Sequence, residues 1–577
     1  MSSLILYYLF ATWITITFTK HPTIRPTPTS PPTPANLTSH VVSINQKTGE
    51  NEPDCVISNK TCKDLHYAFY TTLARNSVFN IITLKIYGDY VLKEAFDINS
   101  TDKDLKALHI MGADKYTKLT SSSSYVSINI GFNRTGYDVQ FLPYSVSFTN
   151  LNVSGFGSEK PAAVMGWYVK NVTIYDSIFI DNKCAALNLL NTPVEIQGCL
   201  FQNNSVNVRH LKRKYTKKAF PFGSASAGGA VGLIYNQISK VNVALLHDNK
   251  FINNRGETYH SKSVAQTSDS KYMFSKSGGA LILAVIDGFY NEFNVFNNQF
   301  IHNSAALGGA MMISNHATSA SNHYYVDNCT FHANRASSTG GGLSFSNWDS
   351  ATDNNMKVSN SKFTANQARV AGGMKILFQS QLSAELPGEQ MVFVEDVIFE
   401  YNRANVASGI HMIYNLAIMG AKPTLPVTIT NSIFAHHSLG FQDIGSGPSA
   451  YSGVVLTNRL DLMFNGHNQW YNNSFESPLY ASNAEVHVDG NLTFANNMVQ
   501  TSGGGITLSD VAHMVVHPGA NLVFVDNYAH VKGGAMFVKT VGFPEMVYKY
   551  NPSCFIQYLD RDHPGGLSPD EWKVRLI

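Results

Sequence analysis

Carboxylates are the residues of this sequence that could cleave a glycosidic bond, and none of them forms a recognisable catalytic pair. Glycoside cleavage needs two carboxyl groups roughly 5 to 9.5 Å apart on one face. Asp176, Asp248 and Asp396 each stand three residues before a repeated aromatic residue, so we interpret them as structural positions of the repeat. Glu400 and Asp181 closely follow such an aromatic residue, where a strand would point them outward, but they lie several repeats apart. We therefore predict no catalytic residue.

Histidines are the next candidates for chemistry, and their spacing does not indicate a metal site. None of the 20 histidines belongs to an HExxH or zinc-finger pattern. The contiguous pair His436-His437 and the repeat-associated His302 and His332 are interpreted as surface or structural residues. We expect neither a metal nor a cofactor.

One basic loop, RHLKRKYTKKAF, interrupts the repeat described below. Its cations could bind an acidic polysaccharide or an anionic lipid, or the loop could be a protease-sensitive site or simply solvated. The candidate anion-binding residues are Arg209, Lys212, Arg213, Lys214, Lys217 and Lys218.

Length and charge exclude several classes of protein. A chain of 577 residues exceeds a single compact core, so several domains or one elongated repeat array must hold these side chains. Charged residues make up only 14% and the net charge is +2, which argues against a nucleic-acid-binding surface.

A repeated sequence motif predicts the architecture. It consists of Asn or Asp, any two residues, Phe, any two residues and Asn, followed by a small residue and then by a Gly pair. The aromatic positions are Phe179, Phe201, Phe251, Phe300, Phe331, Phe363, Phe399, Phe434, Trp470, Phe494 and Phe524. The Asn that follows each of them, replaced by His437 after Phe434, forms a predicted ladder at Asn182, Asn204, Asn254, Asn303, Asn334, Asn366, Asn402, Asn473, Asn497 and Asn527.

The repeat predicts short strands stacked along an axis. Segments such as VTIYDSIFIDN alternate apolar and polar residues with period two, as strands do. Such a chain can bury its repeated side chains only by stacking Phe on Phe and Asn on Asn at about 4.8 Å, the spacing of neighbouring strands. The Asn amides would satisfy buried turn backbone and tolerate a left-handed φ, and the Gly pairs would allow tight corners. We expect distortion between Phe434 and Trp470, where no Gly pair follows on schedule.

Phrases such as Phe300 to Asn303 with Gly308-Gly309-Ala310 resemble those of right-handed parallel β-helix proteins. They are similar to the repeats of chlamydial polymorphic outer membrane proteins and of secreted β-helix proteins of sponges and other simple animals. The resemblance covers Phe179 to about Lys539. It implies an all-β, right-handed parallel β-helix (solenoid), and CKDLHYAFYTTLAR reads as a short amphipathic helix that caps its N-terminal end.

The expected organisation follows from these segments. We assign 1–20 to a signal peptide, 21–50 to a Pro/Thr-rich spacer, 51–80 to an N-terminal cap, 81–540 to the β-helix and 541–577 to a C-terminal segment. The signal rests on the uncharged stretch from Leu4 to Phe18, and an uncleaved anchor is the alternative. In the C-terminal segment the repeat fades and Cys554 has no obvious partner, so we expect a truncated chain or the loss of a downstream module.

Apart from Cys554, the cysteines divide into two groups. Cys55 and Cys62 are the candidate disulfide, which would staple the cap in an oxidising compartment. Cys184, Cys199 and Cys329 occupy small-residue positions of the repeat and should be buried and unpaired. Cys199 and Cys329 are three repeats apart, about 14 Å, which is too far for a disulfide.

The predicted function is binding. We expect a secreted or cell-surface glycoprotein, an adhesive or matrix-like ectodomain with carbohydrate or an extracellular protein as partner. The rival is a divergent polysaccharide lyase or glycoside hydrolase, which outward acidic and basic residues converging over adjacent repeats would favour. Contact with a membrane is expected only through a missing C-terminal module or an uncleaved anchor.

Overall fold

The computed structural model describes a single elongated stack of coils. The residues it describes are 38–56, 60–75, 80–99, 104–115, 117–131, 142–206, 228–236, 243–256, 277–348, 351–380, 391–416, 427–439, 452–510, 512–539, 547–548, 555–559 and 575–576. The predicted signal peptide, most of the spacer, the basic loop, Cys554 and most of the C-terminal segment lie outside them.

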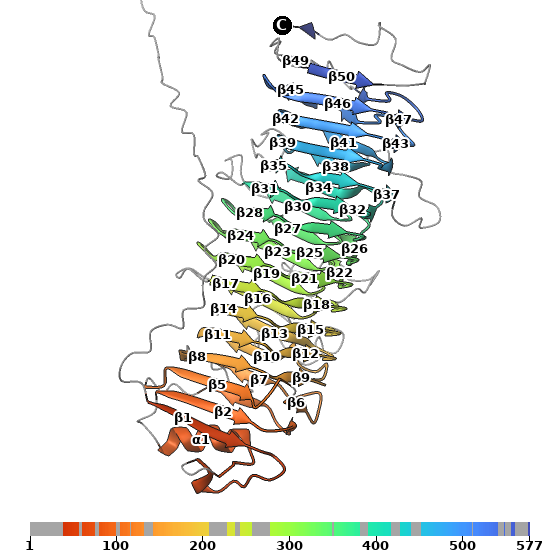
Figure 1. Cartoon of the computed structure of the whole chain (residues 1–577). Helices are drawn as coiled ribbons and strands as arrows, with labels where there is room; N and C mark the ends of the chain where they lie inside the picture. Colours follow the sequence, from red (N-terminus) through yellow and green to blue (C-terminus); the bar gives the residue numbers. More distant parts are fainter. Residues whose placement is uncertain are drawn as a thin grey trace, which may run out of the picture.

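Each coil contributes strands to three rows that run the length of the stack (Figure 1). All strand pairings between coils are parallel in the described part of the chain. The first row consists of β1 (Ser39–Ile44), β2 (Ile81–Ile86), β5 (Ala107–Gly112), β8 (Leu142–Thr149), β11 (Val169–Tyr175), β14 (Val194–Gln197), β17 (Val243–His247), β20 (Glu292–Phe296), β24 (His323–Asp327), β28 (Asn355–Ser359), β31 (Val392–Glu395), β35 (Val427–Thr430), β39 (Leu462–Tyr471), β42 (Glu485–Ala495) and β45 (His513–Val516).

The second row carries the repeated aromatic residues, and the long strands β39 and β42 belong to it as well as to the first. Its other members are β3 (Tyr90–Leu92), β6 (Lys118–Ser121), β9 (Asn152–Ser154), β12 (Ile178–Ile180), β15 (Leu200–Gln202), β18 (Lys250–Ile252), β21 (Gln299–Ile301), β25 (Thr330–His332), β29 (Lys362–Thr364), β32 (Ile398–Glu400), β36 (Ile433–Ala435), β46 (Asn521–Val525) and β50 (Phe555–Leu559).

The third row is a separate sheet that follows the glycine corners. It contains β4 (Phe96–Ile98), β7 (Ile128–Ile130), β10 (Ala162–Trp167), β13 (Ala185–Leu190), β16 (Val231–Asn236), β19 (Leu281–Ile286), β23 (Met311–His316), β27 (Leu343–Asn347), β30 (Met374–Ser380), β34 (Ala407–Leu416), β38 (Gly453–Asn458), β41 (Ser477–Ser482), β44 (Ile506–Ser509) and β48 (Met536–Lys539). Short bridging strands are β22 (Ser304–Leu307), β26 (Arg335–Thr339), β33 (Arg403–Ala404), β37 (Ser438–Leu439), β40 (Ser474–Phe475), β43 (Met498–Val499), β47 (Tyr528–Ala529), β49 (Val547–Tyr548) and β51 (Arg575–Leu576).

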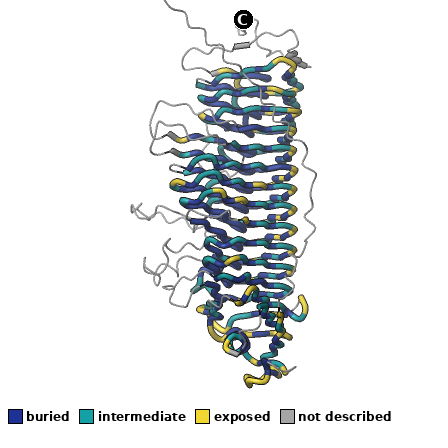
Figure 2. Tube along the Cα trace, turned by 90° about the vertical axis from the view of Figure 1, so that its left-hand side faces the viewer, coloured by how far each residue is buried: buried dark blue, intermediate teal, exposed yellow. Residues whose placement is uncertain are grey.

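This architecture confirms the predicted all-β, parallel β-helix class. One apolar core runs through the coils, and the repeated aromatic rings stack face to face along it from Phe179 to Phe524. Figure 2 shows that buried residues, in dark blue, recur in the coils along the whole stack. The amide ladder is interrupted at His437, whose backbone N donates to Asn473 Oδ1 (3.1 Å). The aromatic column shows no distortion there, because Trp470 stacks on Phe434 and Phe494 with centroids 5.0 and 4.7 Å away. Its indole simply continues the column.

The ladder asparagines form a buried stack of amides between the second row and the third. Asn334 is typical: its Nδ2 donates to the Phe300 carbonyl (2.9 Å) and to Asn366 Oδ1 (3.0 Å), while its Oδ1 accepts from the backbone N of Asn303 (2.9 Å). Similar stacks run through Asn249 and Asn298, and from Asn291 through Asn322 to Asn354. Buried turn backbone is thereby paired without water.

The left-handed φ predicted for the ladder falls on other residues. The residue before each ladder Asn takes it, as in Ala333 (φ 52°). In the repeats from Phe179 to Phe434 the residue three before the aromatic also takes it, as in Asp248 (φ 59°). Asp176, Asp248 and Asp396 are therefore exposed turn residues, chosen because Asn and Asp tolerate this conformation.

The glycine pairs allow the coils to approach each other at the corner. Gly308 has a φ of 59°, and a Cβ on Gly309 would lie 2.2 Å from the carbonyl oxygen of Gly341 in the next coil. Larger residues cannot occupy this position without moving the backbone.

The N-terminal end carries the predicted helix, α1 (Leu65–Arg75), below β1 (Figure 1). Asp64 caps it by accepting from the backbone N of Tyr67 (3.0 Å), and the Phe69 ring packs edge-on against Phe96. A short 3-10 helix, η1 (Pro53–Val56), holds Cys55, which is joined to Cys62 in a disulfide. The first coil starts earlier than expected, since β1 begins at Ser39, within the stretch assigned to the spacer.

Cys184, Cys199 and Cys329 are buried and unpaired, as predicted. Burial raises the pKa of Cys199 and of Cys329 to about 12, so neither thiol forms the reactive thiolate at neutral pH. We predict that iodoacetamide modifies these three residues only after denaturation, as peptide mass mapping would show. Alkylation of any of them in the native protein would contradict the stacking register.

Candidate functional site

The outer face of the first row, from β11 to β31, is the best candidate site. Alternation points every second residue of these strands away from the core. The pairing register aligns the outward residues of neighbouring coils, so that His247 stands beside Phe296 and Asn294 beside Tyr325. We call this surface the outer face; its central residues are Tyr175, Glu195, His247, Asn294, Phe296, Tyr325, Lys357 and Phe393.

A polar cluster occupies the N-terminal part of the outer face. His247 Nδ1 lies 3.0 Å from Asp248 Oδ2, and its Nε2 lies 3.8 Å from Glu195 Oε1, which is an ion-pair distance. The Tyr175 hydroxyl is hydrogen-bonded to Glu195 from the other side. The four residues come from β11, β14, β17 and the turn after β17, so they span three adjacent coils.

The charges of this cluster are coupled. The contact with His247 holds the pKa of Glu195 below its usual value, which outweighs the opposite effect of burial. The pKa of His247 is raised, because the two carboxylates outweigh the effect of burial on the imidazole. Burial, together with the bond to Glu195, raises the pKa of the Tyr175 hydroxyl. The cluster therefore favours an imidazolium between two carboxylates.

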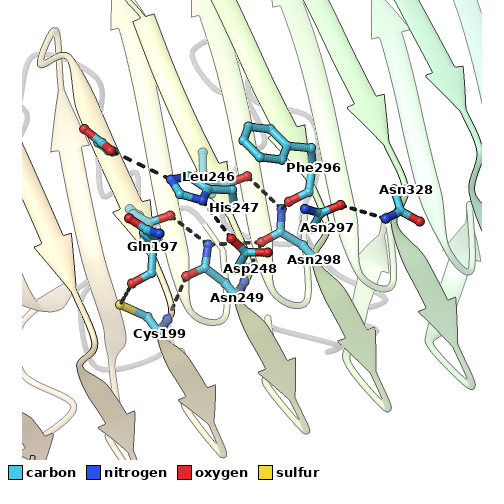
Figure 3. A network of polar contacts seen from close by, with 12 residues as sticks. Gln197, Cys199, Leu246, His247, Asp248, Asn249, Phe296, Asn297, Asn298 and Asn328 are labelled. Carbon is cyan, nitrogen blue, oxygen red and sulfur yellow. Dashed lines mark hydrogen bonds and ion pairs between the residues drawn. The ribbon is translucent and has the colours of Figure 1, made fainter. Parts of the chain in front are cut away.

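Buried amides hold the cluster in place from the core side (Figure 3). Asn249, next to Asp248, donates from Nδ2 to Asn298 Oδ1 (3.0 Å), and its Oδ1 accepts from the backbone N of Cys199 (2.9 Å). The His247 ring stacks on Phe296 with centroids 4.9 Å apart. The imidazole therefore has a stacking partner on one face and a carboxylate near each ring nitrogen.

Further along the outer face, charges are paired and an aromatic ring is exposed. Lys357 Nζ lies 2.7 Å from Glu395 Oε2, and the Tyr325 ring is 42% exposed. Ring, amide and ion-paired side chains therefore follow one another along the stack axis on this face.

The two outward acids predicted from the sequence lie outside the outer face, and each contacts another side chain. Glu400, in β32 of the second row, pairs with Lys362 Nζ at 2.9 Å. Asp181 is in the turn after β12, with φ 55°, and accepts from Asn203 Nδ2 (2.9 Å). The structure does not bring them together. The candidate anion-binding residues Arg209 to Lys218 lie outside the described residues.

Two further titratable groups are buried away from the outer face. Lys375 Nζ lies 3.1 Å from His411 Nδ1 on the third row, and burial lowers the pKa of Lys375 to about 8. Glu476 is fully buried just before β41; its Oε2 accepts from Ser408 Oγ (2.7 Å), and burial raises its pKa to about 8. With this pKa the carboxyl is protonated at neutral pH, as a general acid must be. It is fully buried, however, so it cannot reach a substrate.

The Tyr175–Glu195–His247–Asp248 cluster was missed by the sequence prediction. Glu195 and His247 lie on paired strands of adjacent coils, but they are 52 residues apart in the sequence, with a segment outside the described residues between them. The sequence could have indicated this contact only through the strand register. Counting back from Phe201 and Phe251 places both residues on outward positions of their strands.

No protein-family model matches the sequence, and no curated protein matches it. Among solved structures, the chain is similar to the A-module of the mannuronan C-5 epimerase AlgE6 of Azotobacter vinelandii (12% identity, 87% of this chain and 100% of that chain, TM-score 0.26). It is also similar to the surface protein and adhesin PfbA of Streptococcus pneumoniae (9% identity, 82% and 95% of the two chains, TM-score 0.25). We draw no functional conclusion from them. The fold assignment rests on the strand pairings above.

No helix in the described part of the chain combines the length and apolar character needed to cross a membrane.

Proposed function

We propose that this protein is a secreted or cell-surface β-helix that binds an extended carbohydrate or extracellular protein along its outer face without cleaving it. The observation that carries the proposal is a pair of neighbouring columns on the outer face, one running from Tyr175 to Phe296 and the other from Asn294 to Phe393. Their rings and amides face solvent, while the carboxylates of Glu195 and Glu395 already have partners. Rings offer flat surfaces on which sugar faces stack, and the amides offer hydrogen bonds.

The charge of the face favours a neutral or amine-bearing ligand. One imidazolium between two carboxylates leaves the cluster with a net negative charge, which repels a uronate carboxylate. Pectin- or alginate-like chains are therefore poor candidates for this part of the surface.

The enzymatic rival is supported by one observation, the convergence of Tyr175, Glu195, His247 and Asp248 over adjacent coils. A glycoside hydrolase also needs a protonated carboxylic acid facing the substrate. The raised-pKa carboxyl, Glu476, is buried inside the stack, and Glu195 is shifted in the opposite direction. Binding is therefore the better-supported function.

The extracellular setting is part of the proposal. It is supported by the signal-like N-terminus, by the Cys55–Cys62 disulfide and by sequons at exposed asparagines such as Asn203, Asn328 and Asn472. We also propose a relationship to the chlamydial and sponge β-helix proteins whose repeats this sequence resembles.

We predict that Tyr325→Ala weakens binding of the best ligand from a glycan array at least fivefold, because loss of a stacking ring removes about 1 kcal/mol or more. Surface plasmon resonance would measure the change. Tyr528→Ala is the matched control, since Tyr528 is exposed to the same extent (41%) but lies in β47, outside the first row. Equal losses in both variants, or no loss in Tyr325→Ala, would place the ligand elsewhere.

A further inference from the structure

Two histidines face each other at the far end of the first row, well away from the cluster around His247. His487 is an outward residue of β42, and His517 directly follows β45, the next strand of the row. His487 Nδ1 lies 3.1 Å from His517 Nε2, and the rings are nearly parallel with centroids 5.4 Å apart. These two nitrogens share a hydrogen bond, and its proton belongs to one ring or the other according to the tautomer.

A carboxylate lies beside this pair. Glu485 Oε1 is 3.3 Å from His487 Nε2, which is an ion-pair distance and favours a proton on Nε2. With that proton on Nε2, His487 Nδ1 accepts the hydrogen bond from His517 Nε2, and a metal ion between the rings would replace the shared proton. A carboxylate on the far nitrogen of an imidazole is the arrangement that orients metal-binding histidines and makes them more basic.

The separation of the two facing nitrogens also fits a metal ion. Two imidazole nitrogens bound tetrahedrally to one zinc ion at about 2.05 Å stand about 3.3 Å apart. The observed separation is 3.1 Å, and both rings would turn so that their lone pairs meet at the ion that replaces the shared proton. The His487 side chain is 28% exposed, so an ion can reach the pair from solvent.

We propose that His487 and His517 form a surface site for Zn²⁺ or a similar divalent transition metal, oriented by Glu485. No group of three or more His, Cys, Asp or Glu side chains in the described ranges is arranged to hold a metal, so water completes the coordination. Binding would tie β42 to the segment after β45 and so clamp two adjacent coils near the C-terminal end of the stack. The proposal is independent of the ligand bound by the outer face.

The test is a titration of the untagged full chain with ZnCl2 by isothermal calorimetry. We expect a zinc equivalent whose affinity falls at least tenfold in His487→Ala and in His517→Ala, and severalfold in Glu485→Gln. His302→Ala is the matched control, because His302 and His332 also stand on adjacent coils but meet edge to face with centroids 5.8 Å apart. The control should leave that equivalent unchanged.

Circular dichroism melting curves of all variants separate loss of the site from loss of the fold. In the wild type, zinc should also raise the melting temperature, and the two histidine variants should lose this rise. Zinc binding that is equal in the wild type and both histidine variants, or a histidine pair that binds a proton but no zinc in an NMR titration, would overturn the proposal.

Discussion

Asn334→Ala should lower the free energy of unfolding by about 3 kcal/mol without changing the outer face. The substitution removes an amide that accepts from the backbone N of Asn303 and donates to the Phe300 carbonyl, both in the buried interior. Each buried group left without a partner costs about 1 to 3 kcal/mol. Denaturant unfolding of the purified protein would measure the change.

Asn294→Ala is the control for this substitution. Asn294 lies on an outward position one coil away and donates to Glu292 Oε1 (2.8 Å) at the surface, where water replaces a lost partner. Its removal should cost less than about 1 kcal/mol. Equal costs for the two variants would mean that the amide stack does not stabilise the coils.

Glu476→Gln should make the protein more stable at pH 8 by several kcal/mol, while leaving its stability at pH 4 nearly unchanged. In the folded chain the pKa of Glu476 is raised to about 8 from an ordinary value of 4.5. The folded state therefore binds the proton more tightly, and the free energy of unfolding falls as the pH rises from about 4.5 to about 8. The shift corresponds to a loss on the order of 4 kcal/mol, which the neutral amide avoids.

The difference in unfolding free energy between Glu476→Gln and wild type, measured from pH 4 to pH 9, isolates this residue from all others. Glu395→Gln serves as the comparison, because Glu395 forms an ion pair with Lys357 at the surface and its loss should cost less than 1 kcal/mol. A Glu476→Gln curve parallel to that of the wild type would show that the buried carboxyl is ionised and paired.

The fold could be predicted from the repeat, because the repeat determines which side chains lie above one another in successive coils. Phe at one position and Asn three residues later can be buried together only in parallel coils, and the continuous column from Phe179 to Phe524 follows. The buried placement of Cys184 was predictable for the same reason, since its position in other repeats is occupied by Ala305 and Ala336.

The candidate site was less predictable, because it depends on the outward positions, where the repeat leaves residue types free. Glu195 and His247 meet only because coils of unequal length align their strands in register. The same holds for His487 and His517, which no spacing motif connects. Asp248 was interpreted from the sequence only as a structural position of the repeat, whereas the structure places it in a left-handed turn and also in contact with His247.

Incubation of the purified protein with a panel of neutral, amine-bearing and acidic polysaccharides, with retention and product release followed together, tests the proposed binding function most directly. We predict retention of a neutral or amine-bearing glycan, weakened by Tyr325→Ala, without new reducing ends or unsaturated products. Turnover that Glu195→Gln abolishes at an unchanged melting temperature would contradict binding and establish the cluster around His247 as an active site.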